Sequence, residues 1–166
     1  PISTKWVDVN KGDQQDYDIR CRLVARDMGG AKSDDFYAPT PPLEAKRLLF
    51  SEAAPNRRFG KYEKKLLFVD VRKAYFNAKV SEDNPVYVEL PAEDPARDRG
   101  VCGKVLVHMY GTRPAAKGWH TEFSEFLVHD LGFERGNASQ CVFVHRGRDI
   151  TTAVNGDDFT SAGRKS

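Results

Sequence analysis

Hydrophobic and polar positions alternate in short runs along much of the chain, which is the pattern of half-buried β-strands. The runs TKWVDVN and YDIRCRLVAR flank the polar loop KGDQQ and predict a hairpin near the N-terminus. In the second run the guanidinium groups of Arg20, Arg22 and Arg26 fall on one face, and an apolar set falls on the other. Taken alone, such a polar face most often does no more than face water.

Two other segments carry the spacing of amphipathic helices. Thr40 followed by Pro41 predicts an N-cap and a first helical residue for a helix over about residues 41–54. Over residues 114–131 apolar side chains recur three and four positions apart, and Gly132 is a natural stop. We expect the aromatic side chains of this second helix to pack in the core.

The run KKLLFVDV is apolar at consecutive positions and predicts a strand that is buried on both faces. Asp70 near its end is an anomaly, because an ionised carboxylate in an apolar strand is costly to desolvate without a partner. It either caps the helical segment RKAYFNAKV that follows or binds a metal ion where the strand ends. The mixture of helices with further strand-like runs predicts an α+β fold; these runs are PVYVEL, KVLVHMYG, QCVFVHR, DITTAVN and DFTSAG.

The stretch AVNGDDF holds a second candidate for metal chemistry. Asn155 and Gly156 between two strand-like runs predict a two-residue type I′ turn. The adjacent Asp157 and Asp158 repel each other unless they share a cation, and their hard oxygen atoms suit Mg²⁺. The pair alone fits a turn or a metal site. Converging with Asp70, it would hold two cations about 4 Å apart, as nucleotidyl transfer requires.

Composition adds mainly exclusions. The 166 residues are enough for one domain, and 26 basic against 24 acidic residues give a net charge of only +2. A nucleic-acid-binding surface would therefore have to be local. No apolar run is long enough to span a bilayer, and the start PISTKWVDVN is not a signal peptide. We therefore expect a protein that is soluble, intracellular and not secreted. The three cysteines lack the spacing of a zinc site.

The ordered motifs resemble the reverse transcriptase domain of copia-type long-terminal-repeat (LTR) retrotransposons. The resemblance covers about residues 5–163 and rests on FYAPTPPLEAKRLLFSEAA, FVDVRKAYFNAKV, VYVELP, MYGTRPAAKGWH and VNGDDFTSAG. It implies a polymerase-type palm, an antiparallel sheet backed by helices, with a partial fingers subdomain. We expect residues 1–166 to be a single fragment of a Pol polyprotein, with fingers over about 1–62 and palm over about 63–166. The thumb and RNase H are expected to be absent.

The resemblance implies an RNA-directed DNA polymerase. Such an enzyme transfers a nucleotide from a deoxynucleoside triphosphate (dNTP) to a primer 3′-hydroxyl, using two Mg²⁺ ions or Mn²⁺ in their place. The implied partners are an RNA or DNA template with its primer, the dNTP, and the remaining polyprotein parts, namely thumb, RNase H and integrase. No membrane is implied, and the implied setting is a cytoplasmic retrotransposon particle.

Site residues are implied one by one by the matched motifs. Asp70, Asp157 and Asp158 match the catalytic, metal-binding aspartates, and the backbone carbonyl of Val71 would join Asp70 on a metal ion. Tyr75 matches the aromatic gate that excludes a 2′-hydroxyl, although it could instead be a core aromatic. The remaining implied nucleotide-binding residues are Arg20 and Arg22 on the basic strand, and Gly111 and Arg113 in the segment under the template.

Two departures from the family pattern keep alternatives open. Asn155 and Gly156 stand where the family usually has a tyrosine and an apolar residue, and residues 114–116 are Pro-Ala-Ala instead of Gln-Ser-Pro. One alternative is an inactive, truncated retrotransposon remnant that folds and at most binds nucleic acid. The other is an unrelated small α+β binding module in which NGDD is only a turn.

Overall fold

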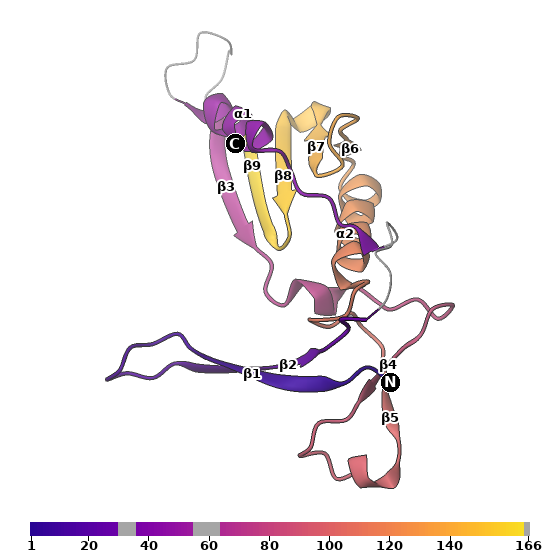
Figure 1. The fold of residues 1–166 in the computed structure, drawn as a ribbon. Helices are drawn as coiled ribbons and strands as arrows, with labels where there is room; N and C mark the ends of the chain where they lie inside the picture. The colour runs from indigo at the N-terminus through magenta and orange to yellow at the C-terminus, as the bar shows by residue number, and fades with distance from the viewer. Residues whose placement is uncertain (30–35, 55–63, 165–166) are drawn as a thin grey trace. The chain divides into compact units, whose positions relative to one another are not determined.

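The computed structural model describes residues 1–29, 36–54 and 64–164 (Figure 1). Helices are mixed with antiparallel sheets, which confirms the α+β class expected from the sequence. No helix within these ranges is long and apolar enough to cross a membrane.

The chain forms two compact units, each built from two separate segments. The first unit comprises Pro1–Tyr37 and Tyr75–Trp119, and the second comprises Ala38–Ala74 and His120–Ser166. The expected division into fingers before about residue 62 and palm after it does not correspond to these two units. It stays a prediction.

The first unit opens with the predicted hairpin. Strand β1 (Thr4–Asn10) pairs antiparallel with β2 (Ile19–Ala25) along the whole length of both strands. The polar loop between them is held by the Asn10 side chain, whose oxygen accepts hydrogen bonds from the backbone N–H groups of Gly12 and Asp18, both at 3.0 Å. These side-chain bonds pair backbone groups of the loop that lie beyond the paired strands.

The faces of β2 follow the predicted alternation, but burial does not follow it all the way. Arg20 and Arg22 share one face of β2, and each is paired directly with a valine of β1. On the other face Ile19 is 54% exposed and Cys21 is exposed, and burial begins only near Leu23. The apolar face is therefore a core face only at the Ala25 end of the strand.

A second small sheet completes the first unit. Strand β4 (Val86–Glu89) pairs antiparallel with β5 (Cys102–Val105). β5 begins two residues earlier than the run KVLVHMYG predicted and ends at Val105, so most of that run is not strand. The core of this unit contains Ala25, Val105 and Met109, with Ile2, Leu23, Val80, Val86 and Val88 packed against it.

The second unit is built on a five-stranded antiparallel sheet in the order β3-β9-β8-β7-β6 (Figure 1). Side chains of directly paired residues lie on the same face of a sheet. The strand pairing therefore shows which face of the sheet each helix covers. The strands are β3 (Lys64–Asp70), β6 (Glu134–Arg135), β7 (Val142–His145), β8 (Ile150–Asn155) and β9 (Asp158–Arg164).

Opposite faces of this sheet are covered by different helices. From α1 (Leu43–Ala53), the buried Leu49 packs with Ala153 and Ala162 on one face. Phe123 of α2 (Ala115–Glu125) contacts the rings of Phe143 and Phe159 on the other, with centroids at 6.1 and 5.4 Å. The core of the second unit thus lies on both sides of β8 and β9.

The predicted helix over residues 114–131 is confirmed as α2 followed by a π-helical turn, Phe126–Asp130, and Gly132 follows with a positive φ of 73°. Trp119, Phe123 and Leu127 are buried, as their spacing predicted. Phe126 is 53% and Leu131 40% exposed, so the apolar stripe is wider than the buried face.

The expected start of the first helix was wrong. α1 begins at Leu43 with Pro42 in the N-cap position and no side-chain cap, so Thr40 is not its cap. The reason is that a residue before proline is disfavoured in the helical region, which keeps Pro41 out of the helix. The short helical segment expected in RKAYFNAKV is confirmed as a 3₁₀ helix, η2 (Ala74–Asn77).

The prediction that β3 is buried on both faces was also wrong. β3 is an edge strand of the sheet as far as the described residues extend, and Leu67, Phe68 and Val69 are 60%, 62% and 43% exposed. Phe68 contacts Phe50 of α1 with ring centroids 6.2 Å apart. An apolar run indicates a strand, but it does not say how many neighbours that strand has.

A charged cluster joins β3, α1, β9 and the residue just before β8, at the far end of β3 from Asp70. The Lys64 ammonium, 9% exposed, lies 2.9 Å from carboxylate oxygens of both Glu52 and Asp149, and Arg164 contacts Asp149 at 3.0 Å. Burial lowers the pKa of Lys64, but its bonds to Asp149 and Glu52 outweigh burial and raise this pKa above its ordinary value. The bonds from Lys64 and Arg164 lower the pKa of Asp149.

Replacing Lys64 by methionine should destabilise the second unit by about 1–3 kcal/mol at pH 7, because two carboxylates lose their shared cation. The cost is below that of a fully buried pair, since the Asp149 side chain is 38% exposed. Because the folded pKa of Asp149 is lowered, its contribution is present above the unfolded value near 4 and is lost as pH falls through the folded value.

Urea denaturation at pH 7 and pH 3 checks this expectation. The difference between wild type and Lys64→Met should shrink at pH 3, while Arg47→Met, which removes an exposed cation from α1, should change stability little at either pH. A difference that is equally large at both pH values would show that packing, and not charge, is what Lys64 provides.

Candidate metal centre and nucleotide-binding residues

The turn that carries the paired aspartates differs by one residue from the predicted turn. Asn155 pairs with Asp158, so the two central residues are Gly156 and Asp157 and not Asn155 and Gly156. Of these central residues only Gly156 has a positive φ, at 66°, which is the pattern of a type II′ turn rather than type I′. Asp157 therefore lies in the loop, whereas Asp158 is the first residue of β9.

The cause of this register is the neighbouring strand. β3 pairs with β9 so that Asp70 lies opposite Asp158, and the Val71 N–H donates to the Asp157 carbonyl at 2.9 Å. These bonds fix the start of β9 at Asp158. The Asn-Gly signal is local and contains nothing about β3, so it could not report this constraint.

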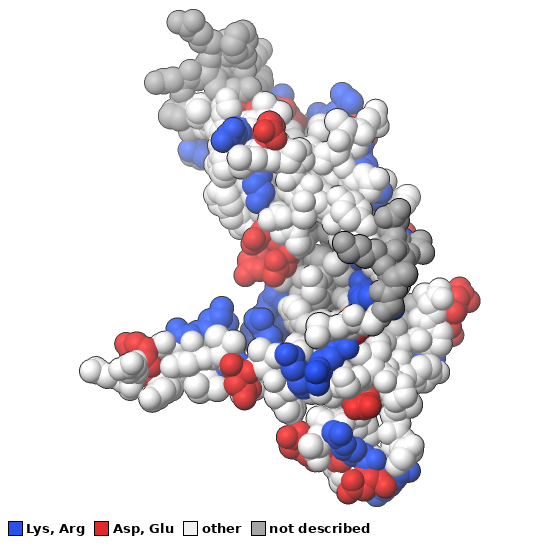
Figure 2. All heavy atoms as spheres, viewed as in Figure 1, with Lys and Arg blue, Asp and Glu red and all other residues white. Residues whose placement is uncertain are grey.

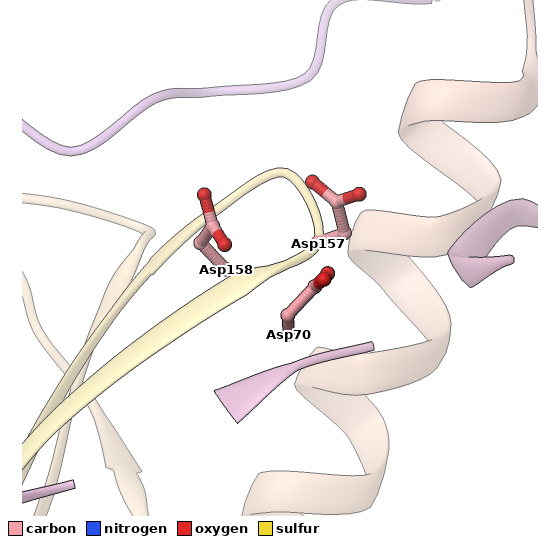
Figure 3. Close-up of side chains that lie close together, drawn as sticks. All are labelled: Asp70, Asp157 and Asp158. Atoms are coloured by element: carbon pink, nitrogen blue, oxygen red, sulfur yellow. The ribbon is translucent and has the colours of Figure 1, made fainter. Parts of the chain in front are cut away.

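The same pairing brings the three aspartates together. Asp70 projects from the end of β3 toward the turn that carries Asp157 and Asp158 (Figure 3). One carboxylate oxygen from each lies within 4.8 Å of the others, and all three residues are exposed. The alternative role for Asp70, as a cap of the segment after β3, stays a prediction.

The donor set fits a hard divalent cation. Two unit charges 4 Å apart interact by roughly 1 kcal/mol in water and several times more near a protein surface, so three clustered carboxylates repel one another. Oxygen-only ligands on an exposed site leave room for water and phosphate oxygens, which is the coordination that Mg²⁺ prefers. Acidic side chains gather at the β8–β9 turn in the surface view (Figure 2).

The implied nucleotide-binding residues lie in the first unit. Tyr75, on η2, contacts the ring of Tyr110 with centroids 4.9 Å apart, and Phe76 contacts the same ring at 5.8 Å. The Arg22 guanidinium carbon lies 5.5 Å from the centre of the Tyr110 ring. The structure thus joins Tyr75 and Arg22 through Tyr110, a residue that the sequence reasoning left out although it immediately precedes Gly111.

The two other arginines have acidic partners. Arg20 is paired with Asp18 at 3.3 Å on the exposed hairpin, where basic side chains line the surface (Figure 2). Asp27 accepts hydrogen bonds from both the backbone N–H of Arg113 and its Nε, at 3.0 and 3.1 Å. These pairs could not be read from the sequence, because neither spacing is that of a regular helix or ladder.

Gly111 has a structural reason to be glycine. Its φ is 86°, and a Cβ placed on it would meet the carbonyl oxygen of Ala25. The close neighbour in the structure is therefore the end of β2, and the expected approach of a template at Gly111 stays a prediction. Of the departing residues 114–116, Ala115 is buried at the start of α2.

Comparison with known proteins identifies the family. A family model described as reverse transcriptase (RNA-dependent DNA polymerase) matches residues 1–166. Neither the curated proteins nor the solved structures gave a match. Because the family match spans the whole sequence, from the basic hairpin to the turn with its paired aspartates, the chain belongs to the reverse transcriptase (RNA-dependent DNA polymerase) family.

Proposed function

We propose that this chain is the RNA-directed DNA polymerase domain of a copia-type LTR retrotransposon polyprotein, adding nucleotides from dNTPs to a primer 3′-hydroxyl. The observation that carries the proposal is the convergence of Asp70, Asp157 and Asp158 at one end of the sheet in a member of the reverse transcriptase family. In this proposal the five-stranded sheet and its helices form the palm, and the β1–β2 hairpin belongs to the fingers.

Asp70, Asp157 and Asp158 are the residues that would hold Mg²⁺, with Mn²⁺ as a substitute, and the Val71 carbonyl is proposed to assist Asp70. When bound, two such ions lower the pKa of an attacking hydroxyl and stabilise the charge on a leaving pyrophosphate. The protein itself contributes the carboxylates that would hold these ions in place. The strand pairing fixes Asp70 against Asp158, so little reorganisation is needed when a cation arrives.

Nucleotide contacts are proposed for the first unit. Arg22 is exposed and lies beside the ring that also contacts Tyr75, so phosphate and sugar could be met by neighbouring side chains. Tyr75 would press against the sugar and disfavour a 2′-hydroxyl. Arg20, Gly111 and Arg113 are proposed to line the path of the template and the incoming nucleotide, with Arg20 and Arg113 already partly neutralised by aspartates.

One observation favours the alternative, an inactive remnant that binds nucleic acid at most. Gly156 has no side chain where the family usually has an apolar residue, and a Cβ placed on it would meet no atom within 4 Å. Asn155 also replaces the usual tyrosine beside the aspartates. Such a site could bind a cation and still hold a primer end poorly.

Metal binding can be tested without polymerase activity. Titration of the chain with Mn²⁺, followed by electron paramagnetic resonance, should give an affinity that falls at least about tenfold in Asp70→Asn and in Asp157→Asn, because each removes a charged ligand. Asp83→Asn, which removes an exposed aspartate from a turn in the first unit, should leave the affinity unchanged. Equal affinity in all four proteins would remove the metal site from the proposal.

Catalysis requires a separate measurement. In primer extension on an RNA template with Mg²⁺ and dNTPs, wild type should exceed Asp70→Asn and Asp157→Asn by at least about a hundredfold, the scale for losing one charge-stabilising group. Asn155→Tyr should raise extension if the turn limits contact with the primer. Should wild type bind Mn²⁺ normally yet extend no primer above the Asp70→Asn background, the remnant would be the correct description.

A further inference from the structure

Tyr110 lies between two residues for which nucleotide contacts are proposed, and it contacts both. We propose that Tyr110 is a positioning residue that holds Arg22 and Tyr75 in one arrangement, so that recognition of the triphosphate and of the sugar are coupled. The inference rests on the proposed function, because it assigns the first unit a role in binding the dNTP.

The contacts of the Tyr110 ring are within the range of attractive interactions. Its centroid lies 4.9 Å from that of Tyr75 at an interplanar angle of 58°, and 5.8 Å from that of Phe76 at 65°. Tilted aromatic pairs at 4.5–7 Å are favourable. The Arg22 guanidinium carbon, 5.5 Å from the Tyr110 centroid, is within the roughly 6 Å reach of a cation–π contact.

The backbone on both sides of Tyr110 is fixed. Its carbonyl accepts a hydrogen bond from the Ala25 N–H at 2.8 Å, and Gly111 lies against the Ala25 backbone in a left-handed conformation. On the other side Met109 is buried, and its carbonyl accepts a bond from the Thr112 hydroxyl at 2.9 Å. A ring held by such a backbone is preorganised, so the groups that rest on it lose less freedom when a ligand binds.

Arg22 differs from the two neighbouring candidate arginines in its charge environment. Arg20 pairs with Asp18 and Arg113 pairs with Asp27, but within the described ranges Arg22 has no acidic partner. Arg22 lies against the aromatic face of Tyr110, which orients the guanidinium without neutralising it. Arg22 is therefore the cation of the three that is best suited to meet a triphosphate.

The proposal predicts that changes to the ring face alter two properties together. Tyr110→Leu should weaken dATP binding about two- to fivefold, the value of one exposed cation–π contact, and should also reduce the preference for dATP over ATP. Tyr110→Phe keeps the ring and should bind like wild type. Arg22→Lys tests the same contact from an exposed position, because an ammonium keeps the charge but cannot stack as a planar group.

The experiment is a fluorescence titration of the chain with mant-labelled dATP and mant-labelled ATP in the presence of Mg²⁺. Tyr87→Leu on β4 is the matched control for the side-chain change in the same unit. In an Arg22→Lys background, Tyr110→Leu should weaken binding by less than it does in wild type, since the shared contact is already weakened. Normal selectivity in Tyr110→Leu, additive effects in the double variant, or loss of selectivity in Tyr110→Phe would each overturn the proposal.

A second readout separates this inference from the proposed function. In the absence of nucleotide, the Arg22 Nε–H proton resonance should be displaced by the Tyr110 ring current, and the displacement should vanish in Tyr110→Leu but persist in Tyr110→Phe. If wild type bound no dATP while this displacement was present, the proposed function would fail for the chain but the positioning contact would stand. If wild type bound dATP and the displacement was absent, only the positioning role would fail.

Discussion

The antiparallel pairing of β3 with β9 is the interaction on which the candidate site depends. It sets Asp70 opposite Asp158, and its last bond, from the Val71 N–H to the Asp157 carbonyl, anchors the loop aspartate as well. A slip of one residue would send Asp70 to the other face of the sheet. The core opposes such a slip, because Leu66 packs with Leu49 on the face that also carries Asp70.

Much of this arrangement could be predicted from local patterns. The N-terminal hairpin and α2 follow from periodicity, and Asp70 in an apolar run was an anomaly that marked a candidate ligand. The family resemblance then implied that the three aspartates act together. The turn register could not, since Asn-Gly favours its own turn geometry and the strand that overrides it is more than eighty residues away. The exposure of β3 and the position of Tyr110 were also missed, because both depend on neighbours that are remote in sequence.

Net charge is a poor guide to the electrostatics of this chain. The formal charge of +2 arises from nearly equal numbers of acidic and basic residues, yet their arrangement is uneven. Three carboxylates stand together at the β8–β9 turn, whereas on the β1–β2 hairpin Arg20 has an acidic partner and Arg22 has an aromatic one. What matters for a polyanionic ligand is which cations keep their charge available, and only tertiary contacts reveal that.

The edge position of β3 has a further consequence, for the solubility of the chain. An edge strand offers unpaired backbone N–H and C=O groups, and natural proteins usually protect such edges with charges, prolines or bulges. Here the middle of β3 carries Leu67, Phe68 and Val69, all partly exposed, and charges stand only at its ends, with Lys65 near one and Asp70 at the other. Among the described strands, the one that delivers a carboxylate to solvent thus also offers an apolar edge for aggregation by strand addition.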